Sequence, residues 1–163
     1  MARYAQHPAH ISEALQEITP SDGGSITYYP CKVTLKDARI FHAVYIEPEK
    51  PYFRVWGVYP EDDKGKQSLR IEEVELVEES QKRLPPQFAN EVYRSGESGM
   101  GYTIFTVVFS DGLRQAYVTG NAVDFITYPE GKGPQNVVSV EPHVGRNENP
   151  LRAPQWFWCL YSE

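Results

Sequence analysis

The residues that most invite a chemical interpretation form a glycine-rich hexapeptide, Gly96-Glu97-Ser98-Gly99-Met100-Gly101. Three glycines in six residues let the backbone approach a partner closely or expose several N–H groups to an anion. A nucleophile elbow does not fit, because Met100 stands where that motif needs glycine and the predicted order is helix then strand. Two interpretations remain. Either Gly96 caps a helix while Gly99 and Gly101 shape the start of a strand, or Glu97, Ser98, Gly99, Met100 and Gly101 form a binding loop.

A second group of candidates is acidic. Carboxylates cluster at Glu61-Asp62-Asp63 and again at positions 72, 73, 75, 78 and 79. If the second cluster projects from a strand, alternate carboxylates form a row that repels itself unless a basic partner faces it. The plainer alternative is a solvated strand that discourages edge-to-edge pairing. Glu72, Glu73 and Glu75 are therefore the candidates for docking a basic protein.

The histidines and cysteines do not assemble a recognisable catalytic or metal site. The histidines are His7, His10, His42 and His143, and the cysteines are Cys31 and Cys159. No cysteine or carboxylate completes a metal-ligand spacing around the histidines, and no Ser-His-Asp group forms by sequence proximity. We expect no catalytic residue, no metal and no cofactor. Both cysteines have apolar neighbours and are predicted to be buried thiols, as suits a cytoplasmic protein.

The charge balance limits the partners. The 163-residue chain has a net charge of −6. Binding to nucleic acid or to an anionic membrane needs a basic face, so an acidic chain disfavours both and favours a basic partner or simple solubility. The segment from Met1 to His7 lacks the apolar core of a signal peptide, and no run reaches the roughly 20 apolar residues that span a bilayer. We expect a cytoplasmic protein.

Two short helices and several short strands must position these candidates. Apolar residues spaced as on one helical face follow Pro8, up to Ile18. A second helix is predicted at 85–95, where Gly96 follows as a left-handed cap. Strands are predicted at 33–36, 39–47, 52–59, 69–77 and 102–109, with a bulge in the fourth at Glu72-Glu73.

The order of these strands contains an internal repeat. Val33 to Arg39 is echoed by Val107 to Leu113, and Tyr59-Pro60-Glu61 is echoed by Tyr128-Pro129-Glu130. The predicted copies are residues 25–80 and 100–142, and the second copy is shorter only in segments that can be connections. The helix at 85–95 would bridge the copies. Because the strand at 102–109 is apolar on both faces and needs cover, we predict one compact domain, 1–163.

The aromatic segment 155–161 ends the chain. It carries Trp156, Phe157, Trp158 and Tyr161. It is predicted to form a last strand or plug that closes the core. The alternative is an exposed aromatic patch, which would mark a partner or homodimer interface.

In both copies, apolar-x-apolar-x-Asp-Gly/Ala is followed by apolar-x-Ala, over Val33 to Ala43 and over Val107 to Ala116. This pattern resembles the opening hairpin of small SH3-like and Sm-like barrels. Those families favour glycine at the turn and the bend; the first copy has Ala38 and Ala43 there. The resemblance implies tandem β-barrels or meanders. It carries over no site residue, because the second Sm motif, which contacts RNA, has no match.

We therefore predict a mainly β fold of two pseudo-repeated antiparallel units with two short α-helices. The predicted function is that of a non-enzymatic cytoplasmic binding protein, which docks a protein partner through the acidic strand or the glycine-rich loop. An inhibitor or immunity-type role against a basic toxin would fit the charge. The alternative is a small-molecule-binding or enzymatic domain with an aromatic cleft between the repeats. A self-associating structural protein is a third class.

Overall fold

Strands make up most of the regular structure, as the sequence predicts. The computed structural model describes residues 3–22 and 27–163. Two compact units can be distinguished: unit 1 is Met1–Ser80 together with Gln155–Glu163, and unit 2 is Gln81–Pro154. Each has a buried hydrophobic core. No helix in the described part of the chain is long and apolar enough to cross a membrane.

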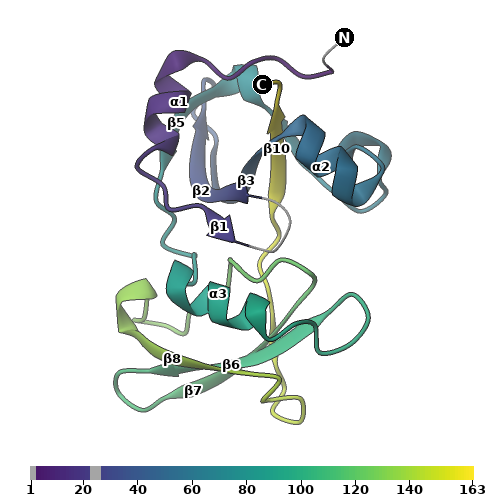
Figure 1. Ribbon diagram of the computed structural model, residues 1–163. Coiled ribbons are helices and arrows are strands. Elements are labelled where there is room, and N and C mark those ends of the chain that lie inside the picture. Colours follow the sequence, from purple (N-terminus) through teal and green to yellow (C-terminus); the bar gives the residue numbers. More distant parts are fainter. Residues whose placement is uncertain (1–2, 23–26) are drawn as a thin grey trace. The chain divides into compact units, whose positions relative to one another are not determined.

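Among the described residues, unit 1 has one six-stranded sheet in the order β1-β2-β3-β10-β4, with β5 also paired to β2 (Figure 1). Its strands are β1 (Ser21–Asp22), β2 (Thr27–Leu35), β3 (Ile40–Pro48), β4 (Ser68–Arg70), β5 (Val74–Glu78) and β10 (Phe157–Tyr161). Its helices are α1 (Ala9–Leu15) and α2 (Glu49–Trp56), with 3₁₀ turns η1 (Pro60–Asp62) and η2 (Ile71–Glu73). The predicted first helix is confirmed as α1, which buries Ile11 and Leu15 and lies against β5.

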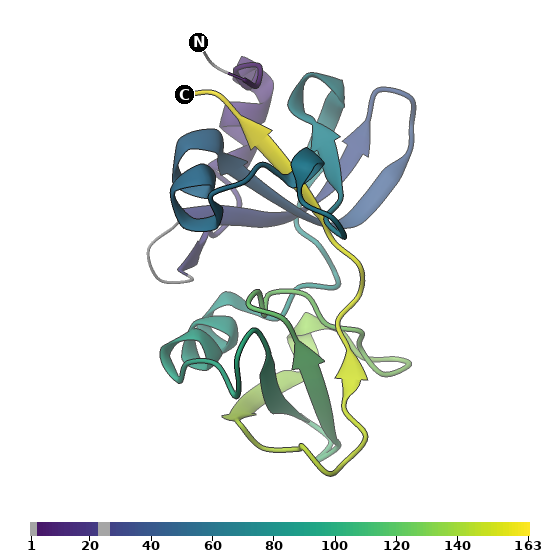
Figure 2. The same ribbon diagram turned by 90° about the vertical axis from the view of Figure 1, so that its right-hand side faces the viewer.

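The aromatic end of the chain forms a strand inside this sheet. β10, yellow in Figure 2, runs parallel to β3 on one side and to β4 on the other. Trp158 is the register partner of Tyr45 in β3, and it is only 3% exposed. The predicted last strand is thus confirmed, but the expectation of purely antiparallel pairing is wrong here. Cys31 and Cys159 are free, buried thiols in the core of unit 1, as predicted.

The segment predicted as a third strand, 52–59, is largely helical. Pro51 falls in the first turn of α2, where a missing N–H costs no helical hydrogen bond. Tyr52 and Trp56 are four residues apart and so share one face of the helix. Gly57 ends it in the left-handed conformation, with φ 72°. Three α-helices are therefore present among the described residues instead of two.

The predicted fourth strand, 69–77, is two strands. β4 pairs with β10, whereas β5 pairs with β2, and η2 separates them where a bulge at Glu72-Glu73 was expected. The break is in the predicted place, but a full turn re-routes the chain to another part of the sheet.

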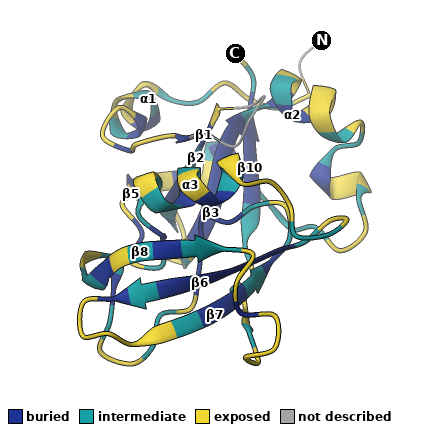
Figure 3. Cartoon of the chain, turned by 60° about the horizontal axis from the view of Figure 1, so that its bottom comes forward, coloured by how far each residue is buried: buried dark blue, intermediate teal, exposed yellow. Residues whose placement is uncertain are grey.

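Unit 2 has a four-stranded sheet among its described strands, in the order β8-β6-β7-β9. Its strands are β6 (Thr103–Phe109), β7 (Arg114–Thr119), β8 (Val137–Pro142) and β9 (Leu151–Arg152), and its helix is α3 (Pro86–Arg94), with a 3₁₀ turn η3 (Pro134–Asn136). β6 is buried along most of its length (Figure 3). The predicted second helix is confirmed as α3, and Gly96 follows it with φ 76°.

Similar hydrogen bonds form in the two hairpins. The N–H of Ala38 donates to the carbonyl of Leu35 at 2.9 Å, and the N–H of Gly112 donates to that of Phe109 at 2.8 Å. Both turn residues have positive φ, 75° and 89°. In each hairpin, the residue after the first strand also forms a hydrogen bond to a 3₁₀ turn. The N–H of Lys36 donates to the carbonyl of Glu73 in η2, and the N–H of Ser110 donates to that of Asn136 in η3.

The mainly β class is confirmed, with two sheets and three α-helices in the described residues. The pseudo-repeat and the single compact domain stay predictions. Residues 25 and 26, the start of the predicted first copy, lie outside the described residues.

Candidate functional site

Unit 1 builds an aromatic cage from α2 and β10, which we define as the rings of Tyr52, Trp56 and Trp158. Because alternate residues of a strand point to opposite faces, Tyr45 and Trp158 lie away from the main core of this unit. Their rings stack at 5.0 Å. Tyr52 meets Trp158 edge-on at 5.0 Å, and Trp56 lies 6.1 Å from Tyr52 and 6.3 Å from Trp158.

A lysine of the same unit occupies the edge of the aromatic cage. The ammonium of Lys66 lies 3.6 Å from the ring centroid of Trp56 and 5.5 Å from that of Tyr52. It donates to the Tyr52 hydroxyl at 3.2 Å and forms an ion pair with Asp63 at 2.9 Å. The face of an aromatic ring attracts a cation, most strongly for tryptophan. This arrangement is therefore a cation site, occupied by a side chain of the protein itself.

A fully buried carboxyl group lies on the same side of the sheet. Glu47 is two residues after Tyr45 in β3, and its residue is 0% exposed. Neither of its carboxyl oxygens has a hydrogen-bond partner within residues 3–22 and 27–163. Burial raises the pKa of Glu47 to about 8, and the positive charge of Lys66 opposes this rise. Two carboxyl groups therefore interact with Lys66: Asp63, which forms an ion pair with it, and Glu47, which has no hydrogen-bond partner among the described residues.

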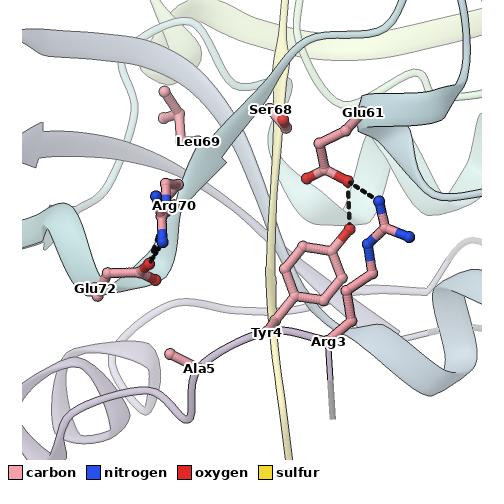
Figure 4. Close-up of a pocket in the computed structure, with 8 residues that line it drawn as sticks. All are labelled: Arg3, Tyr4, Ala5, Glu61, Ser68, Leu69, Arg70 and Glu72. Carbon is pink, nitrogen blue, oxygen red and sulfur yellow. Dashed lines mark hydrogen bonds and ion pairs between the residues drawn. The ribbon is translucent and has the colours of Figure 1, made fainter.

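A separate hollow of about 730 Å³ in unit 1 is lined by residues that already neutralise one another (Figure 4). The Tyr4 hydroxyl donates to Glu61 at 2.6 Å, and Arg3 lies 3.8 Å from the same carboxylate. Arg70 donates to Glu72 at 2.7 Å. Because these charges are paired, the hollow is a weaker candidate for a ligand site than the aromatic cage.

The predicted acidic residues are not on one strand. Glu72 and Glu73 belong to η2, whereas Glu75 is on β5, so the predicted row of these three along a single strand is wrong. Glu72 lines the hollow and pairs with Arg70. Glu73 and Glu75 are exposed and form no ion pair with any described residue.

The predicted glycine-rich loop belongs to unit 2 and is held closed by its own hydrogen bonds. The carboxylate of Glu97 accepts from Gly101 N–H at 2.7 Å. The N–H groups of Ser98 and Gly99 both donate to the carbonyl of Tyr102, at 3.0 and 3.3 Å. These N–H groups are engaged within the loop, so the expected exposure of N–H groups to an anion is wrong for them. Met100, by contrast, is 99% exposed at the tip.

The structure also joins Ser98 to His143, a pair the sequence did not suggest. His143 Nε2 lies 2.9 Å from the carbonyl of Ser95, which can only accept, so Nε2 carries the proton. In the neutral ring His143 Nδ1 is then the acceptor for the Ser98 hydroxyl at 2.7 Å, and Ser98 Oγ accepts from Ile104 N–H at 2.9 Å. This serine fixes the loop to the 143 segment, and the loop N–H groups that would stabilise an oxyanion are already bonded.

The aromatic cage was not predicted, although the sequence contains part of the pattern that forms it. Tyr52 and Trp56 have helical spacing, which the high strand propensity of aromatic residues obscured. Nothing in the sequence indicates that Trp158, more than a hundred residues later, meets them. Among the described residues, no group of three or more His, Cys, Asp and Glu side chains could hold a metal ion.

No protein-family model matches the chain, and neither the curated proteins nor the solved structures contain a match.

Proposed function

We propose that this chain is a non-enzymatic binding protein in which unit 1 docks a basic protein partner. The observation that carries the proposal is the distribution of charge. Unit 1 contains fifteen Asp and Glu against nine Lys and Arg, whereas unit 2 contains seven of each. The net charge of −6 therefore belongs to unit 1 alone. A charge gathered on one unit attracts and orients a partner of opposite charge.

The acidic face is the part of unit 1 best suited to such docking. We define it as the exposed carboxylates on and next to α1 and β5, which lie side by side (Figure 1). Glu78 of β5 pairs with Lys32 and is not counted in the face. The face consists of carboxylates that form no ion pair within the described ranges: Glu13, Glu17, Glu73, Glu75 and Glu79. Leu76, in the middle of β5, is 46% exposed among them. An exposed apolar residue with polar residues nearby suits an interface, which combines an apolar centre with a polar rim.

The two hairpins support a further proposal, that the units are copies of one SH3-like or Sm-like unit. Each unit has two strands joined by a turn with positive φ. A 3₁₀ turn and a further strand come later in the chain, and this further strand pairs with the first strand of the hairpin, β5 with β2 and β8 with β6. The helix before each hairpin lies against that returning strand, α1 on β5 and α3 on β8. Unit 1 as a whole carries the net negative charge and unit 2 carries none, which supports separate tasks for the two units.

The test is affinity capture with the charge removed from the acidic face. Glu73→Gln combined with Glu75→Gln keeps side-chain size and removes two charges. Exposed pairs contribute about 0.2–1 kcal/mol each, so we expect the double variant to bind the captured partner about 2- to 30-fold more weakly. Partner release from the wild type should increase as the Debye length falls from about 10 Å at 0.1 M salt to about 3 Å at 1 M.

The matched control is Glu91→Gln with Glu148→Gln, which removes two exposed carboxylates from unit 2. This control should bind like the wild type. Equal retention of the partner by wild type, double variant and control would contradict docking through the acidic face.

A further inference from the structure

We propose that the aromatic cage is a subsite for the ammonium group of a lysine on the basic partner, and that Lys66 fills this subsite in the free protein. The inference rests on the proposed function and deepens it. The acidic face would attract the partner, and the cage would accept one of its side chains in place of Lys66.

The contacts of Lys66 are contacts to an ammonium group and do not depend on this particular residue. Its Nζ touches the Trp56 ring, the Tyr52 hydroxyl and the Asp63 carboxylate. Each of these would bind the ammonium of an incoming lysine equally well, because ring faces and oxygens recognise the charge and its N–H groups. The Lys66 side chain is 21% exposed, so part of the side chain that would be displaced is in contact with solvent.

The loop that carries Lys66 is built so that this side chain can be exchanged without unfolding a strand. Lys66 follows Gly65, which has φ 91°, and precedes β4. The backbone N–H of Lys66 donates to Asp63 O at 3.1 Å, and Trp158 N–H donates to Gln67 O at 2.9 Å. These backbone bonds hold the loop independently of the Lys66 ammonium.

Glu47 supplies the second argument. An ammonium has three N–H donors, and that of Lys66 uses two acceptors, Tyr52 and Asp63. The fully buried Glu47 carboxyl has no donor among the described residues. A buried polar group without a partner is unfavourable unless a ligand supplies one. Glu47 interacts electrostatically with both Lys66 and Tyr52, so an ammonium bound beside Tyr52 would be favoured by Glu47 as well as by Asp63.

The first experiment uses Lys66→Ala in the full chain, with n-butylammonium as the probe. Binding is followed by the fluorescence of the cage tryptophans and by the midpoint of thermal unfolding. We expect n-butylammonium to bind saturably and to restore the unfolding midpoint of the variant. Its affinity should be at least tenfold higher than that of n-butanol, the neutral analogue of similar size. A partly desolvated cation–π contact contributes about this tenfold factor. Wild type should bind butylammonium more weakly than the variant, because Lys66 competes. The matched control is Lys64→Ala, which removes an exposed lysine two residues before Lys66. This variant should behave as wild type.

Equal binding of n-butanol and n-butylammonium, or no binding of either, would overturn the proposal. If Lys66→Ala does not fold, Lys66→Met is used instead, because methionine keeps the apolar stem and removes the charge. The same comparison of n-butylammonium with n-butanol then tests the proposal.

The second experiment identifies the source of the ammonium. A pentapeptide with one central lysine is titrated into Lys66→Ala, and the same peptide with acetylated lysine is the control. We expect the lysine peptide to bind at least as tightly as butylammonium and the acetylated peptide to be at least tenfold weaker. Binding of butylammonium without binding of the peptide would overturn the assignment to a protein lysine. Since neither experiment alters Glu73 or Glu75, failure here is distinct from failure of docking through the acidic face.

Discussion

Replacing Glu47 with glutamine measures the effect of burying this carboxyl group. Its side chain is inaccessible on the aromatic side of β3, with no hydrogen-bond partner in the described part of the chain. Glutamine has nearly the same size but cannot ionise. The comparison of Glu47→Gln with wild type therefore isolates the titration of one group, because all other titrations cancel.

The magnitude follows from the pKa. Burial raises the pKa of Glu47 from 4.5 to about 8. One pKa unit corresponds to about 1.4 kcal/mol, so ionising this carboxyl costs about 5 kcal/mol more in the folded chain than in the unfolded chain. Because folding raises the pKa, this contribution to stability is complete below pH 4.5 and is lost as the pH rises through about 8.

Urea denaturation at about pH 5 and about pH 8.5 is the assay. Integrated over this range, the free energy of unfolding of Glu47→Gln should rise by about 4 kcal/mol relative to wild type. Glu75→Gln, which removes an exposed carboxylate, controls for loss of a charge as such. If the difference between Glu47→Gln and wild type is the same at both pH values, the carboxyl is not neutral in the folded chain and the reasoning is wrong.

Two further predictions concern unusual backbone and side-chain positions. Ala38 and Gly112 occupy the positive-φ positions of the two hairpins, where a side chain costs about 1–2 kcal/mol. Ala38→Gly should therefore raise the free energy of unfolding, measured in urea, by about 1 kcal/mol, and Gly112→Ala should lower it by about 1 kcal/mol. Changes of the same sign in the two variants would contradict this reasoning. Ser98→Ala leaves the N–H of Ile104 and the ring of His143 without their partner, which should destabilise unit 2 by about 1–3 kcal/mol and speed proteolysis at Met100. An unchanged cleavage rate would mean that Ser98 does not hold the loop.

Local features could be predicted from the sequence, and features that join distant segments could not. The two predicted helices and the Asp37 and Asp111 turns depend on residues within one or two turns of the chain, so their spacing is informative. Parallel pairing of Trp158 with Tyr45 has no local signature, because no turn connects the two strands. The aromatic cage depends on that pairing, and so it was not predictable. The acidic candidates were found by composition, but η2 placed Glu72 apart from Glu75.

The position of β10 also has a consequence for folding during synthesis. Unit 1 consists of two segments separated in the chain by the whole of unit 2. The ribosome therefore synthesises all of unit 2 before the strand that lies between β3 and β4. Until that strand arrives, the edges of β3 and β4 have no neighbour, and Tyr45 and Tyr52 lack the indole on which they stack. During this interval the nascent chain exposes an aromatic surface and an open strand edge, both of which promote aggregation, and the pairing of β10 with β3 and β4 covers both.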